Sequence, residues 1–250
     1  TVLICSALIG GVAHNSWGLP MGASLIICVI VGTLFGVLNG ILVSRFKMPP
    51  FVATLGTQMV AQGVGAIVSK VMTVRYPDLT SPDGWFKHVF FKTSSGFPVG
   101  IVWLALAFVI AYIVLNKTKV GRYIFAVGSN EEAARLSGIN VAKWKMTAYI
   151  ISGLFSGLAG IMYAAAYTSI IPATGAGFET LAIAGVVIGG TSLSGGVGSL
   201  SGTLIGVYIM SVLKQGLMSM NLQAHYQTLF TGIVVIVAVM LDNYRNQKGR

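Results

Sequence analysis

Charged side chains are scarce in this sequence. Only 9% of its 250 residues are Asp, Glu, Lys or Arg, whereas a soluble domain carries about a quarter. With 55% hydrophobic residues and a mean hydropathy of +0.82, the chain cannot cover an apolar core with a charged surface. Its long apolar runs lack the period-two alternation of an outer-membrane β-barrel. The composition predicts an all-α, polytopic bundle of transmembrane helices.

Residues that catalyse reactions or bind metals are also few. Cys5 and Cys28 lie in apolar runs without metal-ligand or redox spacing. His14, His88 and His225 are far apart in the sequence and show no ligand pattern. No phosphate-binding G-x-x-x-x-G-K-[ST] motif is present, so the chain itself is not expected to hydrolyse ATP. We therefore expect a protein that is not an enzyme and that has no metal or cofactor of its own.

About eight apolar segments follow one another along the chain. Most of them can cross a hydrocarbon layer about 30 Å thick, at about 1.5 Å per helical residue. Residues 178–190 are too few to cross comfortably. The first segment is also too short, so we expect that the N-terminus of the complete subunit precedes Thr1. The segments are residues 1–13, 19–44, 51–68, 98–115, 146–167, 178–190, 203–218 and 226–241.

The basic residues predict the orientation. Eleven Lys and Arg residues fall on one side of the predicted membrane and four on the other. Cytoplasmic loops are enriched in these residues, so the first side is expected to be cytoplasmic and the loop 69–97 extracytoplasmic. Nucleic-acid binding is the alternative, but the basic residues form no single stripe with interleaved aromatics. The cytoplasmic set lies in residues 45–47, in the loop 116–145 and in the C-terminal tail 243–250.

Glycines recur at four-residue spacing within several segments. Such faces let helices approach closely in a membrane, and a narrow substrate path lined by glycine backbone is the alternative. The strings GTLFGV (32–37) and GTLIGV (202–207) match at five of six positions, which suggests an inverted repeat. The spaced glycines are Gly32, Gly36, Gly40, Gly153, Gly157, Gly202 and Gly206.

A broken segment lies between residues 168 and 202, where proline and glycine interrupt the apolar pattern. Such segments indicate a transporter's path, so we expect this one inside the bundle. Glu179 could instead be a first-turn charge that favours a helix N-terminus, and the polar residues of 51–68 could bond neighbouring helices. For Lys214, snorkelling to the outer interface is the expectation. The candidate path residues are Thr54, Thr57, Gln58, Gln62, Phe178, Glu179, Gly189, Gly190 and Thr191.

The cytoplasmic loop contains a short predicted helix. Ser129 followed by Glu132 fits a capping box, and Gly138 fits a left-handed C-terminal cap. These signals predict about two helical turns between Asn130 and Ser137. The segment could be a surface turn or a helix that docks in a groove of a cytoplasmic partner, and apolar residues expected to be exposed favour docking. These residues are Ala133, Ala134 and Leu136.

Three strings resemble the permeases of bacterial ABC-type monosaccharide importers of the ribose, galactose and xylose group. They are GSNEEAARLSGINV (128–141), VVIGGTSLSGGVGSLSGTLIG (186–206) and PPFVATLGT (49–57). The resemblance covers nearly the whole chain. It implies a single permease domain over residues 1–250, with about ten membrane segments in the complete subunit. The family's acidic stretch expected just before Thr1 is absent.

The resemblance also implies partners and a substrate. A second permease copy or paralogue, two ATPase subunits that carry ATP and Mg, and a periplasmic sugar-binding protein would complete an importer of a ribose-like sugar in the bacterial inner membrane. An ion-coupled secondary transporter or a channel is the alternative, although buried acidic residues for ion coupling are nearly lacking. The residues implied to contact the ATPase are Asn130, Glu131, Glu132, Ala133, Ala134, Arg135, Leu136, Ser137 and Gly138.

Overall fold

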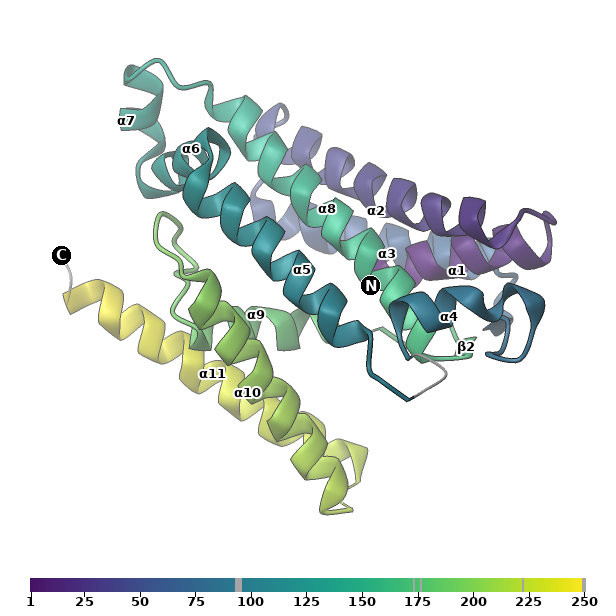
Figure 1. Cartoon of the computed structure of the whole chain (residues 1–250). Coiled ribbons are helices and arrows are strands. Elements are labelled where there is room, and N and C mark those ends of the chain that lie inside the picture. The colour runs from purple at the N-terminus through teal and green to yellow at the C-terminus, as the bar shows by residue number, and fades with distance from the viewer. Residues whose placement is uncertain (93–95, 173, 176, 222, 249–250) are drawn as a thin grey trace. The chain divides into compact units, whose positions relative to one another are not determined.

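The computed structural model describes residues 1–92, 96–172, 174–175, 177–221 and 223–248, which form helices joined by short loops (Figure 1). Arg250, one of the basic residues assigned to the cytoplasmic side, lies outside the described residues. The elements are α1 (Val2–Asn15), α2 (Met21–Ser44), α3 (Pro50–Val68), β1 (Val74–Arg75), η1 (Pro82–Gly84), α4 (Trp85–Phe90), α5 (Gly100–Tyr112), η2 (Ile113–Lys117), α6 (Lys119–Ser129), α7 (Glu131–Leu136), α8 (Val141–Ala166), β2 (Ser169–Ile170), α9 (Phe178–Ile188), α10 (Leu200–Ser219) and α11 (Ala224–Lys248).

All eight predicted apolar segments are helical, which confirms the polytopic helical fold. Among the residues that the structure describes, five helices are long and apolar enough to cross a membrane, and three shorter apolar helices accompany them. The broken segment contains α9, whose 11 residues span about 16 Å, roughly half of a hydrocarbon layer. The five long spans are Met21–Ser44, Pro50–Val68, Gly100–Lys117, Val141–Ala166 and Leu200–Ser219.

The chain divides into two compact units. Unit 1 comprises Thr1–Ile110 and Asn140–Ala176, and unit 2 comprises Ala111–Ile139 and Gly177–Arg250. Residues 116–139 of the predicted cytoplasmic loop 116–145 belong to unit 2, together with the helices α9, α10 and α11. Each unit packs through close contacts between its own helices.

In unit 1, α2 and α8 run antiparallel and meet through glycines. A methyl group added to Gly32 would lie 2.6 Å from the backbone nitrogen of Gly157, and one added to Gly36 would lie 2.5 Å from the carbonyl oxygen of Tyr149. Real side chains essentially never come so close, so neither position can carry one without movement of the helices. The packing interpretation of these glycine stripes is therefore confirmed.

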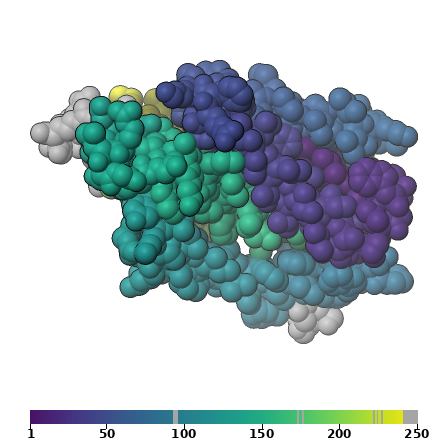
Figure 2. Space-filling view, turned by 90° about the horizontal axis from the view of Figure 1, so that it is seen from above, coloured from purple at the N-terminus to yellow at the C-terminus, as the bar shows by residue number. Residues whose placement is uncertain are grey.

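The helix α1 packs on this pair and on α3. Cys5 and Cys28 are buried and unbridged, as packing residues would be. The space-filling view shows the purple to indigo atoms of the N-terminal part of the chain adjoining along one face (Figure 2). Unit 1 thus has a continuous helical core around α2.

One end of unit 1 is closed by polar contacts between distant segments. The strands β1 and β2 pair antiparallel, with Val74 opposite Ile170. The side-chain amide of Asn15, at the end of α1, donates to the carbonyl oxygen of Arg75 at 2.7 Å. Lys87 Nζ donates to Thr168 Oγ1 at 3.2 Å. Residues 74–87 and 168–170 therefore lie on the same side of the bundle, as the alternating topology requires.

In unit 2, α9 and α10 form a second glycine-packed pair. A methyl group on Gly185 of α9 would lie 2.8 Å from the Cα of Val207, and one on Gly206 of α10 would lie 2.7 Å from the nitrogen of Gly189. The two GTLxGV strings thus have the same local role, because the glycines of each pack on a neighbouring helix of the same unit. Whether they belong to an inverted repeat stays a prediction.

Candidate functional site

The short cytoplasmic helix predicted from the sequence exists as α7, but its N-terminal cap differs from the prediction. Ser129 is the last residue of α6, and Asn130 is the cap: its Oδ1 accepts a hydrogen bond from the backbone N–H of Ala133 at 2.9 Å. The capping box of Ser129 and Glu132 was therefore wrong. Because α6 continues to Ser129, only the next residue is free to adopt the extended backbone of a cap.

The C-terminal cap agrees with the prediction. Gly138 has a φ of +79°, which is the left-handed conformation. Its N–H donates to the carbonyl oxygen of Arg135, and the N–H of Ile139 donates to that of Ala134, both at 3.0 Å. This pair of bonds is the Schellman motif. The six-residue helix is thus capped at both ends, which offsets the weak stability of so short a helix in water.

The surface of α7 is polar apart from one large apolar side chain, that of Leu136. Leu136 is 80% exposed, whereas Ala134 is only 5% exposed. The expectation that Ala134 is exposed was wrong, since α7 packs this face on its own unit. Glu132 lies 3.6 Å from Arg135, and such an exposed ion pair contributes about 0–1 kcal/mol. Leu136 therefore remains the apolar group that α7 offers to a partner.

The helices α6 and α7 follow the span α5 in the sequence. The span α5 ends in the π-helix η2, and Thr118 then caps α6 by accepting the N–H of Val120 at 3.1 Å. Gly121 packs against the backbone of Leu115, so the chain turns back on itself at this point. Within unit 2, η2, α6 and α7 form one connected block.

The loop between α9 and α10, residues 189–199, contacts the end of α6. We call it the glycine loop. A methyl group on Gly128 would lie 2.7 Å from the nitrogen of Gly196, and one on Gly195 would lie 2.8 Å from the carbonyl oxygen of Gly128. The backbones of the two segments touch directly, two residues before the cap of α7. The loop that follows the broken segment and the candidate coupling helix are therefore adjacent.

The glycine loop also has internal hydrogen bonds. The N–H of Ser192 donates to the carbonyl oxygen of Val197 at 3.0 Å, which closes a turn. Thr191 Oγ1 lies 3.2 Å from Thr203 Oγ1 of α10. Gly190 has a φ of +85°, so glycine suits the exit from α9. Among the candidate path residues, Gly189, Gly190 and Thr191 thus form the base of this loop.

The other end of α9 holds the aromatic and charged candidates. Glu179 lies in the first turn, and its Oε1 accepts the N–H of Gly177 at 3.0 Å, as a charge that stabilises a helix N-terminus would. The ammonium of Lys214, on α10, lies 5.1 Å from the centroid of the Phe178 ring. The sequence did not reveal this cation–π contact, because the two residues are 36 positions apart.

The polar residues of α3 differ from one another in their environment. Thr57 is 4% exposed and donates to Asn39 Oδ1 of α2 at 2.7 Å, so it bonds a neighbouring helix. Thr54 donates to carbonyl oxygens of its own helix. Gln58 is half-buried. Asn39 was not among the predicted residues, although an Asn within an apolar run is a signal for such a bond.

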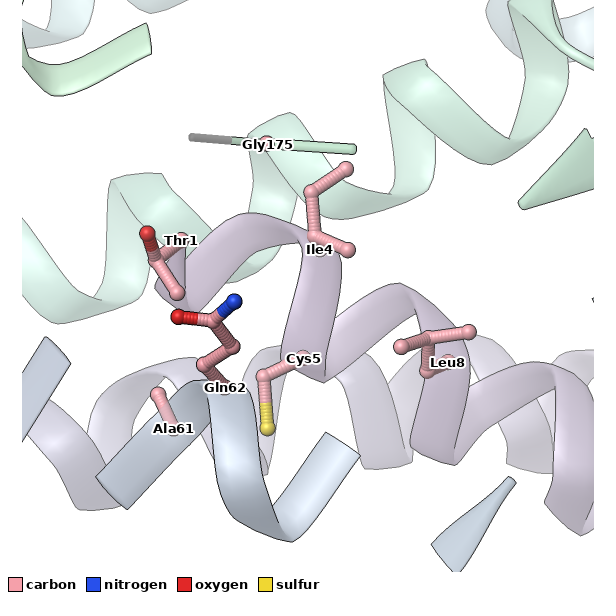
Figure 3. A pocket seen from close by; sticks show the side chains of 7 residues that line it. All are labelled: Thr1, Ile4, Cys5, Leu8, Ala61, Gln62 and Gly175. Atoms are coloured by element: carbon pink, nitrogen blue, oxygen red, sulfur yellow. The ribbon is translucent and has the colours of Figure 1, made fainter. Parts of the chain in front are cut away.

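Gln62 lines a small pocket between α1 and α3 in unit 1 (Figure 3). The volume of about 10 Å³ accommodates about one water molecule and no sugar. The four candidates on α3 belong to unit 1, and the five on or after α9 belong to unit 2. The pocket is lined by Thr1, Ile4, Cys5, Leu8, Ala61, Gln62 and Gly175.

Comparison with known proteins gives consistent matches. Residues 1–239 match the family described as "Branched-chain amino acid transport system / permease component". The chain is 36% identical to the ribose import permease protein RbsC of Haemophilus influenzae, with 97% of this chain and 75% of the relative aligned. It is 40% identical to RbsC of Bacillus subtilis, covering 83% of this chain and 64% of the relative.

A further relative is the D-allose transport system permease protein AlsC of Escherichia coli, 35% identical over 89% of this chain and 67% of the relative. No solved structure matches. The relatives are transport components rather than enzymes, and the multi-pass helical fold agrees with them. Because the family match covers residues 1–239, the protein belongs to the permease family of ABC-type importers.

Proposed function

We propose that the chain is the permease subunit that carries a monosaccharide, foremost a ribose-like sugar, across a bacterial inner membrane. The names of the relatives support this substrate class, since they are import permeases for ribose, fructose, D-allose and galactose. A periplasmic binding protein delivers the sugar, and a second permease copy or paralogue completes the path. ATP and Mg are held by separate ATPase subunits.

The ATPase docks on α7. The observation that carries this proposal is the combination of a cap at each end of α7 with one large exposed apolar side chain, Leu136. A preformed helix binds a groove without a large ordering cost, and its apolar side chain supplies the anchor. The contact residues on this surface are Asn130, Glu131, Glu132, Ala133, Arg135, Leu136, Ser137 and Gly138, while Ala134 holds α7 on its own unit.

The sugar path includes the N-terminal end of α9. Phe178 offers an aromatic face, and Glu179 and Lys214 offer an acceptor and a donor for hydroxyl groups. Gly189, Gly190 and Thr191 belong to the path's cytoplasmic end. On α3, Gln58 and Gln62 are candidates as well, and Thr54 and Thr57 bond groups of their own or a neighbouring helix.

In this orientation the loop 116–145 and the C-terminus are cytoplasmic. The positive-inside distribution supports it. An ion-coupled transporter is the second candidate, and the sequence counts against it: none of the five long spans contains Asp or Glu. Ion coupling normally uses such carboxylates within the membrane.

Uptake by the reconstituted importer tests the proposal. The permease, its ATPase and the binding protein are placed in proteoliposomes with labelled ribose, allose, galactose, fructose and xylose. We expect uptake of one or more of these sugars that requires ATP and all three components. Uptake by the permease alone would contradict the proposal, as would ATP-driven uptake of branched-chain amino acids without any sugar.

A further inference from the structure

We infer that the glycine loop, residues 189–199, is a second part of the surface that binds the ATPase, next to α7. This inference rests on the proposed function and extends it to a segment outside the predicted coupling loop. Its occupant is the same ATPase subunit that receives Leu136.

The glycine loop lies directly beside the cap of α7. The backbone of Gly196 lies against that of Gly128 and Ser129, and α7 is capped by the very next residue, Asn130. The glycine loop is therefore continuous with the block that carries α7, on the same side of the membrane. A partner that covers α7 meets this loop at its edge.

Hydrogen bonds within the glycine loop fix its shape. The hydrogen bond from Ser192 N–H to the carbonyl oxygen of Val197 closes the loop into a turn. A second bond, from Gly195 N–H to the carbonyl oxygen of Ser192 at 3.2 Å, holds its tip. A loop fixed by its own bonds loses little conformational freedom on binding, which is a property of good docking elements.

The exposed surface of the glycine loop is uncharged and partly apolar. Val197 is 66% exposed and Leu193 is 56% exposed, and residues 189–199 contain no charged side chain. In contrast, α7 carries Glu131, Glu132 and Arg135 on its surface. Leu136 and the loop tip thus supply apolar contacts beside a charged rim, the arrangement typical of protein interfaces. This pattern fits an apolar groove with a polar edge on the ATPase.

Cysteine photo-crosslinking tests the inference directly. The two natural cysteines within the described residues are buried, so a newly introduced surface cysteine can be labelled selectively with a benzophenone maleimide. Three variants are compared in the assembled permease–ATPase complex in nanodiscs. Val197→Cys tests the glycine loop, Leu136→Cys tests α7, and Leu79→Cys is the matched control, since Leu79 is 45% exposed in the loop assigned to the opposite side.

We expect crosslinks to the ATPase from positions 136 and 197 and none from position 79. Crosslinks from 136 alone would overturn the role of the glycine loop and leave the proposed function intact. Crosslinks from neither 136 nor 197 would contradict both. A crosslink from 197 to a second permease copy, or to lipid only, would also overturn the inference.

An affinity measurement provides the second readout. The ATPase is titrated onto nanodisc-embedded permease carrying Val197→Asp or the milder Val197→Thr. A buried interface anchor replaced by a charge should weaken binding about tenfold or more, whereas Thr keeps the shape but buries a hydroxyl group and should weaken binding less than Asp does. Equal affinities for wild type and Val197→Asp would contradict the inference.

Discussion

The backbone of Gly36 on α2 lies against that of Gly153 on α8, and a methyl group on Gly153 would lie 2.7 Å from the Cα of Gly36. The two helices can approach this closely only because both residues lack a side chain. The contact joins two spans that are more than 100 residues apart in the sequence. Along the two helices it lies between the contact of Gly32 with Gly157 and the contact of Gly40 with Met146.

Gly153→Ala should destabilise unit 1. The added methyl group has no space, and overpacking costs typically about 1–3 kcal/mol. Thermal unfolding in detergent would show a lower Tm. Gly63→Ala is the matched control, because Gly63 lies within α3 with nothing within 4 Å of the added group. An equal Tm for both variants would argue against close α2–α8 packing.

Gly128→Ala should weaken ATPase binding and lower uptake. The methyl group would push against Gly196 and shift the glycine loop, while alanine suits the helix α6 better than glycine does. We expect both ATPase binding and uptake to fall about fivefold or more. Gly216→Ala adds the same group in open space on α10 and should leave uptake unchanged. Normal uptake by Gly128→Ala would show that this contact transmits no movement.

Asn130→Ala should loosen α7. Loss of an N-terminal cap costs about 1 kcal/mol, and Asn130→Asp should restore most of it. Hydrogen exchange of residues 133–137 measures the effect, and we expect faster exchange in the alanine variant only. Ser129→Ala serves as the control, because the side chain of Ser129 does not cap α7. Faster exchange in Ser129→Ala than in Asn130→Ala would restore the capping box that the sequence suggested.

Lys87 should make stability depend on pH in the alkaline range. Its side chain is 4% exposed, and burial lowers the pKa of its ammonium below the ordinary 10.5, although Asp78 opposes the shift. In the window between the lowered pKa and 10.5, the unfolded chain binds more protons than the folded one. Stability from this group therefore rises with pH across that window and is lost as pH falls through the folded pKa.

Lys87→Met removes this titration and keeps most of the volume. The difference in Tm between wild type and variant, measured from pH 8 to about 10.5, should shift in favour of the wild type as pH rises. A difference that stays constant over this range would show that Lys87 titrates normally in the folded protein.

Much of the fold could be predicted from the sequence because a bilayer allows few structures for an apolar segment that crosses it. Apolar runs of sufficient length form helices, and all eight predicted segments do so. The end of α7 was predicted correctly from Gly138, because the left-handed backbone conformation at a helix C-terminus strongly favours glycine. The start of α7 was misplaced by one residue, because Ser129 and Asn130 are both good caps and only the length of α6 decides between them.

Less of the candidate site could be predicted from the sequence. The contacts between Phe178 and Lys214, between Thr57 and Asn39, and between Gly128 and Gly196 each join residues on different elements. No local pattern specifies such pairs, since small-residue stripes and isolated polar groups fit many partners. The exposed side of α7 was also only partly predicted, as the burial of Ala134 depends on the rest of unit 2.

The sequence by itself determined that this protein is a helical membrane permease, where its spans lie, and that a short capped helix interrupts them. Low charge, long apolar runs and capping residues act locally, so their effects can be predicted without knowing which segments pack together. The tertiary structure decided which helices meet through glycine, which cap α7 uses, and that the glycine loop lies against the coupling block. These features depend on contacts between segments far apart in the chain, where close packing and not local preference selects the partner.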